Sequence, residues 1–418
     1  MFQGLSLEQA PPYKIPLRFY VTGIVYLLAL AVLMIVFALD ISSRFDYTSV
    51  ALTHTLTLGF FTHIMFGSMF QMIPVMLGIA YKNVVRDANI IYTLVNLGAV
   101  LFIAGFLSAK IPLMHSGGLM VFLGFIYFAT LSLRTVLQAS EKDYLVKNFA
   151  ASFALLFVAA VFGFIALLGH SGVVDSVKFG DIHIALMLFG WVFLLINAVS
   201  YRIIPMFFVA KEFPKIFKEV LYIAMVVLVA AFAYLRLTDN STFLSFVKMA
   251  LGILVVAFAL MSIFILKNRK RARSDISVSL WHFSMANAII AASLFMVQSF
   301  VGYDFAFFIA FFALFGAIFA LMNAMLYKIV PFLTWFHLSS SMVFEAEMSE
   351  VIAKKMMRLQ VGFYFASYVA FSLSFVSSWM VIAGSVLFLL SASLLLKNVL
   401  GGMKYYNKLI VKKPDFTI

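Results

Sequence analysis

The chain of 418 residues contains no cysteine, and only 11% of its residues are charged. The lack of cysteine excludes disulfides, iron–sulfur clusters and thiolate metal sites, so any metal or haem iron must be held by His, Met or oxygen ligands. Soluble domains carry roughly 25% charged residues. A chain this poor in charge has too few polar side chains to cover a soluble fold, which excludes an ordinary water-soluble protein.

Apolar side chains take the place of the missing charge, since they make up 64% of the chain, with 49 Phe and 23 Met. A lipid bilayer accepts such a surface, and each crossing needs about 20 consecutive apolar residues. Windows of this size predict twelve membrane spans. They lie near residues 17–39, 50–80, 89–109, 113–135, 146–169, 181–208, 217–235, 243–266, 277–299, 304–333, 357–376 and 378–397.

The net charge of +13 would fit a nucleic-acid-binding protein, but its distribution fits a membrane protein better, because Lys and Arg collect at the cytoplasmic ends of spans. With the N-terminus inside, all but five of the 30 Lys and Arg residues flank cytoplasmic ends. The five are Arg44, Lys110, Lys178, Arg236 and Lys248. We therefore expect a multi-pass protein of the inner (plasma) membrane. Both termini should be cytoplasmic, with lipid as the surrounding partner and no nucleic-acid partner.

The second, sixth and tenth predicted spans end in the same pattern. In each, a glycine lies fifteen residues before a proline, a small residue seven before it and an aromatic residue four before it. The glycines are Gly59, Gly190 and Gly316, and the prolines are Pro74, Pro205 and Pro331. Small residues let membrane helices pack closely, and proline is expected to stop or kink each helix here.

The spacing of this pattern indicates an internal triplication. The prolines are 131 and 126 residues apart, which is the length of four spans with their loops. The sequence thus predicts an all-α integral membrane protein with twelve transmembrane helices, arranged as three pseudo-threefold four-helix units. The repeats cover about 17–135, 146–266 and 277–397, within a single membrane domain, residues 1–418.

Four histidines fall near the outer face in this topology: His54, His115, His170 and His183. Imidazole is the usual protein ligand of haem, copper and zinc. We expect a cofactor site centred on His54 and His183, with His115 and His170 as further metal ligands. The same residues also fit four unrelated, hydrated histidines at the membrane interface, and the sequence does not decide between the two interpretations.

His63 follows His54 by nine residues. On an α-helix this places it about 13.5 Å deeper and on the opposite face, so the two cannot share one ligand set. A mid-membrane imidazole must face the bundle interior and find a partner. We expect His63 to bind a second cofactor or transfer protons, or else to form a structural hydrogen bond with a neighbouring helix.

Span two also carries a likeness to a known family. His54 is followed by the segment 67–78, GSMFQMIPVMLG. This stretch resembles the second helix of the catalytic subunit of haem–copper oxidases, in which a haem-ligating His precedes a Gly-rich stretch that ends in Pro and Gly. The three four-helix units resemble that subunit over the whole chain. The resemblance implies haem b or copper as the cofactor and respiratory proteins as partners.

The departures from this family concern the oxygen-reducing centre. The oxidases take haem ligands from a His-x-His pair in the tenth span and copper ligands from adjacent His residues in the seventh. Residues 305–314 and 216–235 contain no His, and His183 lacks a tyrosine four residues later. The chain is therefore similar to a diverged, non-oxidase relative, such as the NnrS-type proteins, and no catalytic residue is predicted. A permease-like transporter and a cofactor-free membrane scaffold remain alternatives.

Overall fold

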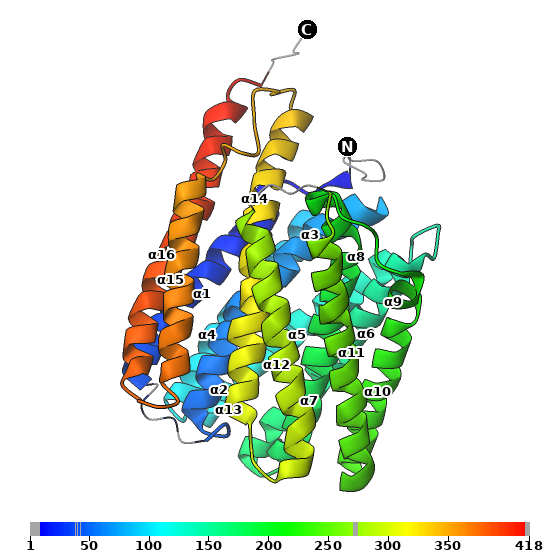
Figure 1. The fold of residues 1–418 in the computed structure, drawn as a ribbon, viewed down its shortest axis with the longest axis vertical. Helices are drawn as coiled ribbons and strands as arrows, with labels where there is room; N and C mark the ends of the chain where they lie inside the picture. The colour runs from blue at the N-terminus through cyan, green and yellow to red at the C-terminus, as the bar shows by residue number, and fades with distance from the viewer. Residues whose placement is uncertain (1–8, 38, 40, 42, 271–274, 414–418) are drawn as a thin grey trace. The chain divides into compact units, whose positions relative to one another are not determined.

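The computed structural model describes residues 9–37, 39, 41, 43–270 and 275–413, and its elements are helices (Figure 1). In these ranges, ten helical stretches are long and apolar enough to cross a membrane. They are Lys14–Phe37, Tyr47–Leu77, Val84–Leu107, Ile111–Val136, Tyr144–Ser171, Ser176–Phe208, Ser241–Lys267, Ile276–Val301, Ala306–Ser340 and Met380–Ile410. The chain is therefore an all-helical, multi-pass membrane protein, as predicted.

Two further helices lie where the seventh and eleventh spans are predicted. Helix α10 (Leu221–Leu237) is apolar and has 17 residues, and α15 (Lys354–Leu373) has 20. Helix α15 is separate from the last helix, which begins at Met380. The prediction of cytoplasmic termini falls on residues 1–8 and 414–418, which lie outside the described residues.

The long helices are apolar on their packed and outward faces alike. In α11 (Ser241–Lys267), Leu251 and Phe258 are buried, whereas Ile253 and Leu260 on the same helix are more than half exposed. A soluble protein would place polar side chains on the exposed face. Lipid as the outer solvent explains why these residues form long helices without a polar face.

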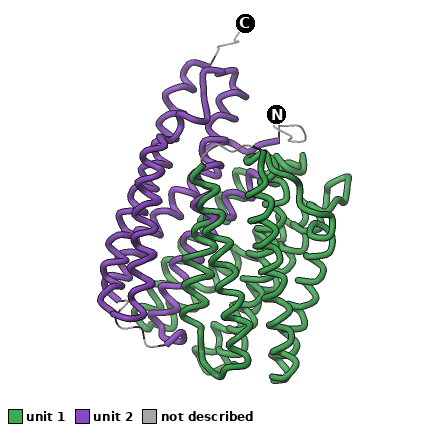
Figure 2. The backbone as a smooth tube through the Cα atoms, viewed as in Figure 1, with its two compact units in different colours: residues 1–6, 73–320 green, residues 7–72, 321–418 purple. Residues whose placement is uncertain are grey.

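The chain divides into two compact units (Figure 2). Unit 2 comprises residues 7–72 and 321–418. It contains α1 (Lys14–Phe37), α2 (Tyr47–His54), the π-helix η3 (Thr55–Phe61), most of α3 (Thr62–Leu77), most of α14 (Phe319–Ser340), α15 and α16 (Met380–Ile410). Within this unit α16 packs against both α1 and α15. The first and last helices of the chain therefore lie side by side.

Unit 1 comprises residues 1–6 and 73–320, of which the structure describes the second range apart from residues 271–274. Its helices are α4 (Val84–Leu107), α5 (Ile111–Val136), α6 (Tyr144–Leu168), η4 (Gly169–Ser171), α7 (Ser176–Ala185), η5 (Leu186–Phe193), α8 (Leu194–Phe208), α9 (Lys215–Glu219), α10, α11, α12 (Ile276–Val301), α13 (Ala306–Ala310) and η6 (Phe311–Ile318). Helix α4 packs on α5, α5 on α6, and α11 on α12. Neighbours in sequence are thus neighbours in space.

Glycines bring α4 and α5 into backbone contact. A Cβ atom on Gly117 would lie 2.3 Å from the backbone nitrogen of Phe102, and one on Gly105 would lie 2.5 Å from that of Met114. No larger residue fits at either position without moving a helix. This is the close approach through small residues that membrane helices use in place of hydrophobic driving force.

Each span with the repeated glycine–proline pattern contains a π-helical segment. The segments are η3, η5 and η6, and they contain Gly59, Gly190 and Gly316 respectively. Of the two predicted effects of proline, a stop or a kink, the stop was wrong, because α3, α8 and α14 run past their prolines to Leu77, Phe208 and Ser340. Membrane helices tolerate proline where neighbouring groups satisfy the freed carbonyl.

The tenth span is longer than predicted. Its apolar window ends near residue 333, yet α14 continues to Ser340. Beyond the proline, Leu338 packs with Val343, Ala346 and Leu409 in a small apolar cluster of unit 2. Tertiary packing rather than an apolar run holds this last part of the helix.

Candidate functional site

His63 is completely buried in unit 2, at the second position of α3. Its Nδ1 lies 3.0 Å from the carbonyl oxygen of Leu58. Its ring centroid lies 5.9 Å from that of Phe19 and 5.4 Å from that of Tyr26, both on α1. Because a carbonyl oxygen can only accept, Nδ1 carries the proton and Nε2 carries the lone pair of the neutral ring.

The π-helical segment explains this hydrogen bond. At its end the N–H of Thr62 donates to the carbonyl of Thr57, five residues back. In the α-helix that follows, each N–H bonds the fourth carbonyl back. Where the hydrogen-bond spacing changes from five residues to four, the carbonyl of Leu58 is left without a backbone N–H of the helix, and the side chain of His63 donates to it instead. The local backbone therefore fixes the orientation of the imidazole.

His54 ends α2 and is half-buried in unit 2. Its Nδ1 lies 2.8 Å from the carbonyl oxygen of Val50 on the preceding turn. The half-turn separation predicted between His54 and His63 assumes an unbroken α-helix. Residues Thr55–Phe61 between them are π-helical, so that angle does not apply, since a π-helix has more residues per turn.

His183 occupies the equivalent stretch of unit 1, on α7 just before η5. Its Nδ1 lies 2.8 Å from the carbonyl oxygen of Ala159 on α6. A Cβ atom on Gly163 would lie 2.6 Å from this Nδ1, so the glycine makes room for the ring. As in His63, Nδ1 therefore carries a proton, and Nε2 is the lone-pair atom when the ring is neutral.

His115 and His170 lie at one end of unit 1. Nε2 of His115, on α5, is 3.3 Å from the hydroxyl of Ser171, the residue that follows His170. The ring of His170 meets Phe106 edge to face, with centroids 5.2 Å apart. The Nε2 atom of His115 therefore faces a hydroxyl group.

Of the five candidate histidines, His54 and His63 lie in unit 2, and the other three, His115, His170 and His183, lie in unit 1. Among the residues that the structure describes, no group of three or more His, Cys, Asp or Glu side chains could hold a metal ion. A haem or copper site in this part of the chain would therefore take at most two of these side chains as ligands. Haem iron accepts such a set.

A buried polar cluster in unit 2 joins three helices. Tyr327 on α14 donates to Oε1 of Gln360 on α15 at 2.9 Å, and Nδ2 of Asn323 reaches the same oxygen at 3.2 Å. Nε2 of Gln360 lies 2.8 Å from the hydroxyl of Ser391 on α16, and Asn398 on that helix donates to Tyr327 at 3.0 Å. All of these groups are neutral, so the cluster binds helices together and offers no acid or base.

A signal for this cluster is present in the sequence. Isolated polar residues inside apolar spans are costly in lipid and face the bundle interior. Asn323 and its counterpart Asn197 lie eight residues before their prolines. In unit 1 the hydroxyl of Tyr201 donates to the carbonyl of Phe217 at 2.7 Å and lies 3.2 Å from Oδ1 of Asn197 on its own helix.

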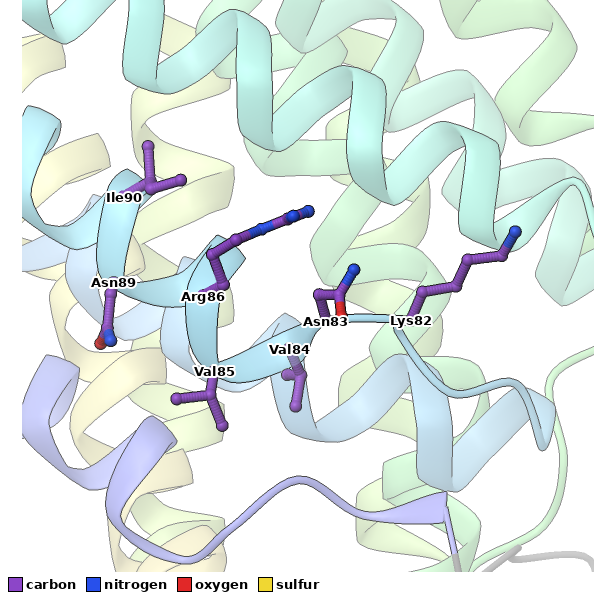
Figure 3. Close-up of a pocket in the computed structure, with 7 residues that line it drawn as sticks. All are labelled: Lys82, Asn83, Val84, Val85, Arg86, Asn89 and Ile90. Carbon is purple, nitrogen blue, oxygen red and sulfur yellow. The ribbon is translucent and has the colours of Figure 1, made fainter.

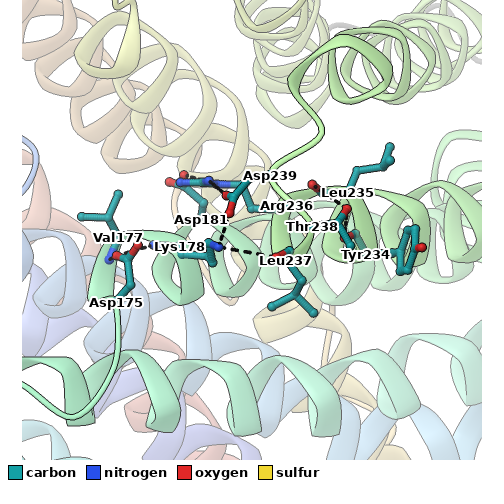
Figure 4. A network of polar contacts seen from close by, with 10 residues as sticks. All are labelled: Asp175, Val177, Lys178, Asp181, Tyr234, Leu235, Arg236, Leu237, Thr238 and Asp239. Atoms are coloured by element: carbon teal, nitrogen blue, oxygen red, sulfur yellow. Dashed lines mark hydrogen bonds and ion pairs between the residues drawn. The ribbon is translucent and has the colours of Figure 1, made fainter.

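An ion-pair network closes one end of α7 against α10 (Figure 4). Nε of Arg236 lies 3.1 Å from Asp181, and Nζ of Lys178 lies 2.6 Å from Asp239, which Arg236 also contacts at 3.4 Å. Asp175 caps α7 by accepting from the backbone N–H groups of Lys178 and Val177, which hold the pKa of its carboxyl below the ordinary value. Two of the five cations that do not flank predicted cytoplasmic ends are therefore neutralised locally.

Comparison with models of known protein families gives no match, and no curated protein matches the chain. The likeness to haem–copper oxidases rests on the residues of span two and on the predicted topology. The function is therefore inferred from the geometry and chemistry of the described residues.

Proposed function

We propose that this protein is a redox or sensing protein of the inner membrane that binds haem or copper through histidine Nε2 atoms and is not a terminal oxidase. One observation carries the proposal: in His54, His63 and His183 alike, Nδ1 donates to a backbone carbonyl. Metal-ligating histidines usually bond their other ring nitrogen to a carbonyl or carboxylate, which fixes the ring and its tautomer. The Nε2 lone pair is then the ligand atom.

The protein's own part in this proposal is to hold neutral rings in fixed positions. A carbonyl of α6 holds His183, and the carbonyl of Leu58 together with two aromatic rings of α1 holds His63. Bound haem or copper supplies one-electron redox chemistry or binds a small diatomic molecule. The absent His-x-His pair argues against a second metal that would reduce oxygen.

We also propose twelve spans in three four-helix repeats, with both termini cytoplasmic. The count is supported by α10 and α15, two helices of 17 and 20 residues at the predicted positions of the seventh and eleventh spans, since about 17 residues are the lower limit for a span. The repeat is supported by η3, η5 and η6, which contain the three glycines of the pattern. The orientation is supported by the local pairing of Lys178 and Arg236, cations that the positive-inside rule leaves on the outer face.

The experiment is a visible spectrum of the chain purified from haem-replete cells, oxidised and dithionite-reduced, with metal analysis of the same sample. We expect a Soret band or bound copper that weakens in His54→Ala, His63→Ala or His183→Ala. His282→Ala is the control, because this histidine lies on α12 and is not a proposed ligand. Respiratory partner proteins would then be sought with the loaded protein.

A colourless, metal-free sample would overturn the proposal. It would leave the permease-like and scaffold interpretations, which a transport assay on sealed vesicles separates. A spectrum that changes only in His115→Ala or His170→Ala would keep the cofactor but contradict the assignment of its ligands.

A further inference from the structure

A groove of about 640 Å³ lies at the beginning of α4, where the chain enters the membrane from the turn after α3 (Figure 3). Its lining is amphipathic, with cationic and amide side chains beside aliphatic ones. The lining residues are Lys82, Asn83, Val84, Val85, Arg86, Asn89 and Ile90. The side chains of Lys82, Asn83 and Arg86 extend to the same side of the chain.

The guanidinium of Arg86 is oriented by a buried carboxylate. Its Nε lies 3.0 Å from Oδ1 of Asp87, whose side chain is only 4% exposed, whereas that of Arg86 is 65% exposed. The hydroxyl of Tyr127 on α5 donates to the same oxygen at 2.9 Å. Asp87 is therefore held from two sides and fixes Arg86 through one nitrogen. The side chain of Arg86 remains accessible to an external acceptor, since it is 65% exposed.

The groove needs an occupant that is anionic at one end and apolar at the other. Lys82 and Arg86 both supply positive charge, and the guanidinium of Arg86 adds the fork geometry that suits phosphate oxygens. Ile90 lies one turn after Arg86 on the same side of α4 (Figure 3) and is more than two-fifths exposed, and an acyl chain would cover it. This charge complementarity, at the end of a membrane-spanning helix, points to a lipid.

We propose that this groove binds the headgroup of an anionic phospholipid, with the phosphate between Lys82 and Arg86 and an acyl chain along Ile90. The inference is independent of the haem or copper proposal, since it uses none of the candidate histidines. It depends on the proposed orientation only for the leaflet from which the lipid comes.

The test uses the full-length chain in a mild detergent with equal amounts of phosphatidylglycerol and phosphatidylcholine, followed by native mass spectrometry. We expect the protein to retain phosphatidylglycerol in preference. A basic residue near an anionic lipid contributes about a fivefold change in affinity. Lys82→Gln and Arg86→Gln should each weaken retention by about that factor. Ile90→Ser should weaken it as well, through the acyl chain.

Lys147→Gln is the matched control, because this lysine is also exposed at the beginning of a spanning helix, α6, but lies outside the groove. It should leave retention unchanged. Equal retention of the two lipids would overturn the proposal, as would an equal loss in the Lys147→Gln variant. Displacement of the lipid by excess inorganic phosphate would identify a phosphate site and overturn the lipid assignment. A cofactor-free but lipid-binding chain would leave this inference intact.

Discussion

Replacing Gln360 by leucine tests whether the buried polar cluster of unit 2 holds its three helices together. The amide of Gln360 accepts from Asn323 and Tyr327 on α14 and donates to Ser391 on α16. Leucine has a similar size and fills the space, so the substitution removes hydrogen bonds without opening a large cavity. It also leaves the Nδ2 group of Asn323 and the hydroxyl of Tyr327 without this acceptor.

The magnitude follows from the number of bonds. Interhelical hydrogen bonds in membrane proteins contribute about 0.6 kcal/mol on average and up to about 1.7. The three side-chain bonds of Gln360 therefore predict a loss of about 2 to 5 kcal/mol in the free energy of unfolding. Tyr327→Phe should cost less, because the tyrosine hydroxyl takes part in two of the cluster's bonds.

Gln71→Leu provides a control of the same chemistry. Gln71 is 1% exposed, and within the described residues neither atom of its amide has a hydrogen-bond partner. Burying an unsatisfied amide costs free energy, so leucine here should preserve stability or raise it by about 1 kcal/mol. The free energies come from denaturant titration in mixed micelles, followed by tryptophan fluorescence. If Gln360→Leu were no more destabilising than Gln71→Leu, the cluster would not be the link between α14, α15 and α16.

Three further substitutions test other contacts, each by the same unfolding measurement. Gly117→Ala should lower the free energy of unfolding by about 1 to 3 kcal/mol through overpacking. Its control is Gly362→Ala, whose new methyl group meets open space and which should be neutral or gain up to about 1 kcal/mol from helix propensity. Equal effects of the two substitutions would contradict the backbone contact of α4 and α5. Arg236→Gln should cost about 1 kcal/mol, a difference that shrinks at high salt. Lys218 donates a hydrogen bond to Glu212 and lowers the pKa of this carboxyl from 4.5. The wild-type chain should therefore be more stable than Glu212→Gln above pH 4.5, and this difference in the free energy of unfolding should disappear as the pH falls through the lower folded-state pKa. A difference that persists in acid would contradict the pairing.

The sequence predicted the spans well because one physical quantity, the thickness of the bilayer, sets the length of each apolar run. The predicted windows 113–135 and 243–266 correspond to α5 (Ile111–Val136) and α11 (Ser241–Lys267). The prediction failed where tertiary packing decides instead. The end of α14 is polar and aromatic, so hydropathy does not reveal it, and contacts of Leu338 with Leu409 hold it as a helix.

The candidate site was predictable only as a set of residue types. Histidine in a span indicates an interior position, and His63 is indeed buried. The hydrogen-bond partner of each ring could not be predicted, because it depends on backbone carbonyls rather than on side chains. The carbonyl of Ala159 reaches His183 from another helix, and no pattern in the sequence specifies that contact. The partners of Gln360 were hidden for a similar reason, since they come from helices on either side of it in the chain.

The glycine pattern shows how a correct sequence signal can receive an incomplete interpretation. Close packing was the expected reason for glycine, and contacts support it: a Cβ on Gly59 would lie 2.5 Å from Tyr26, and one on Gly316 would lie 2.2 Å from Asn287. The same glycines also lie in π-helical segments. A π-helical segment changes which carbonyl each N–H bonds, and so it changes the face on which later side chains emerge. The three segments end 13, 12 and 13 residues before their prolines, so they shift the three spans alike. Residues on opposite sides of one segment, such as His54 and His63, must therefore be compared in the register of backbone hydrogen bonds and not by an α-helical angle.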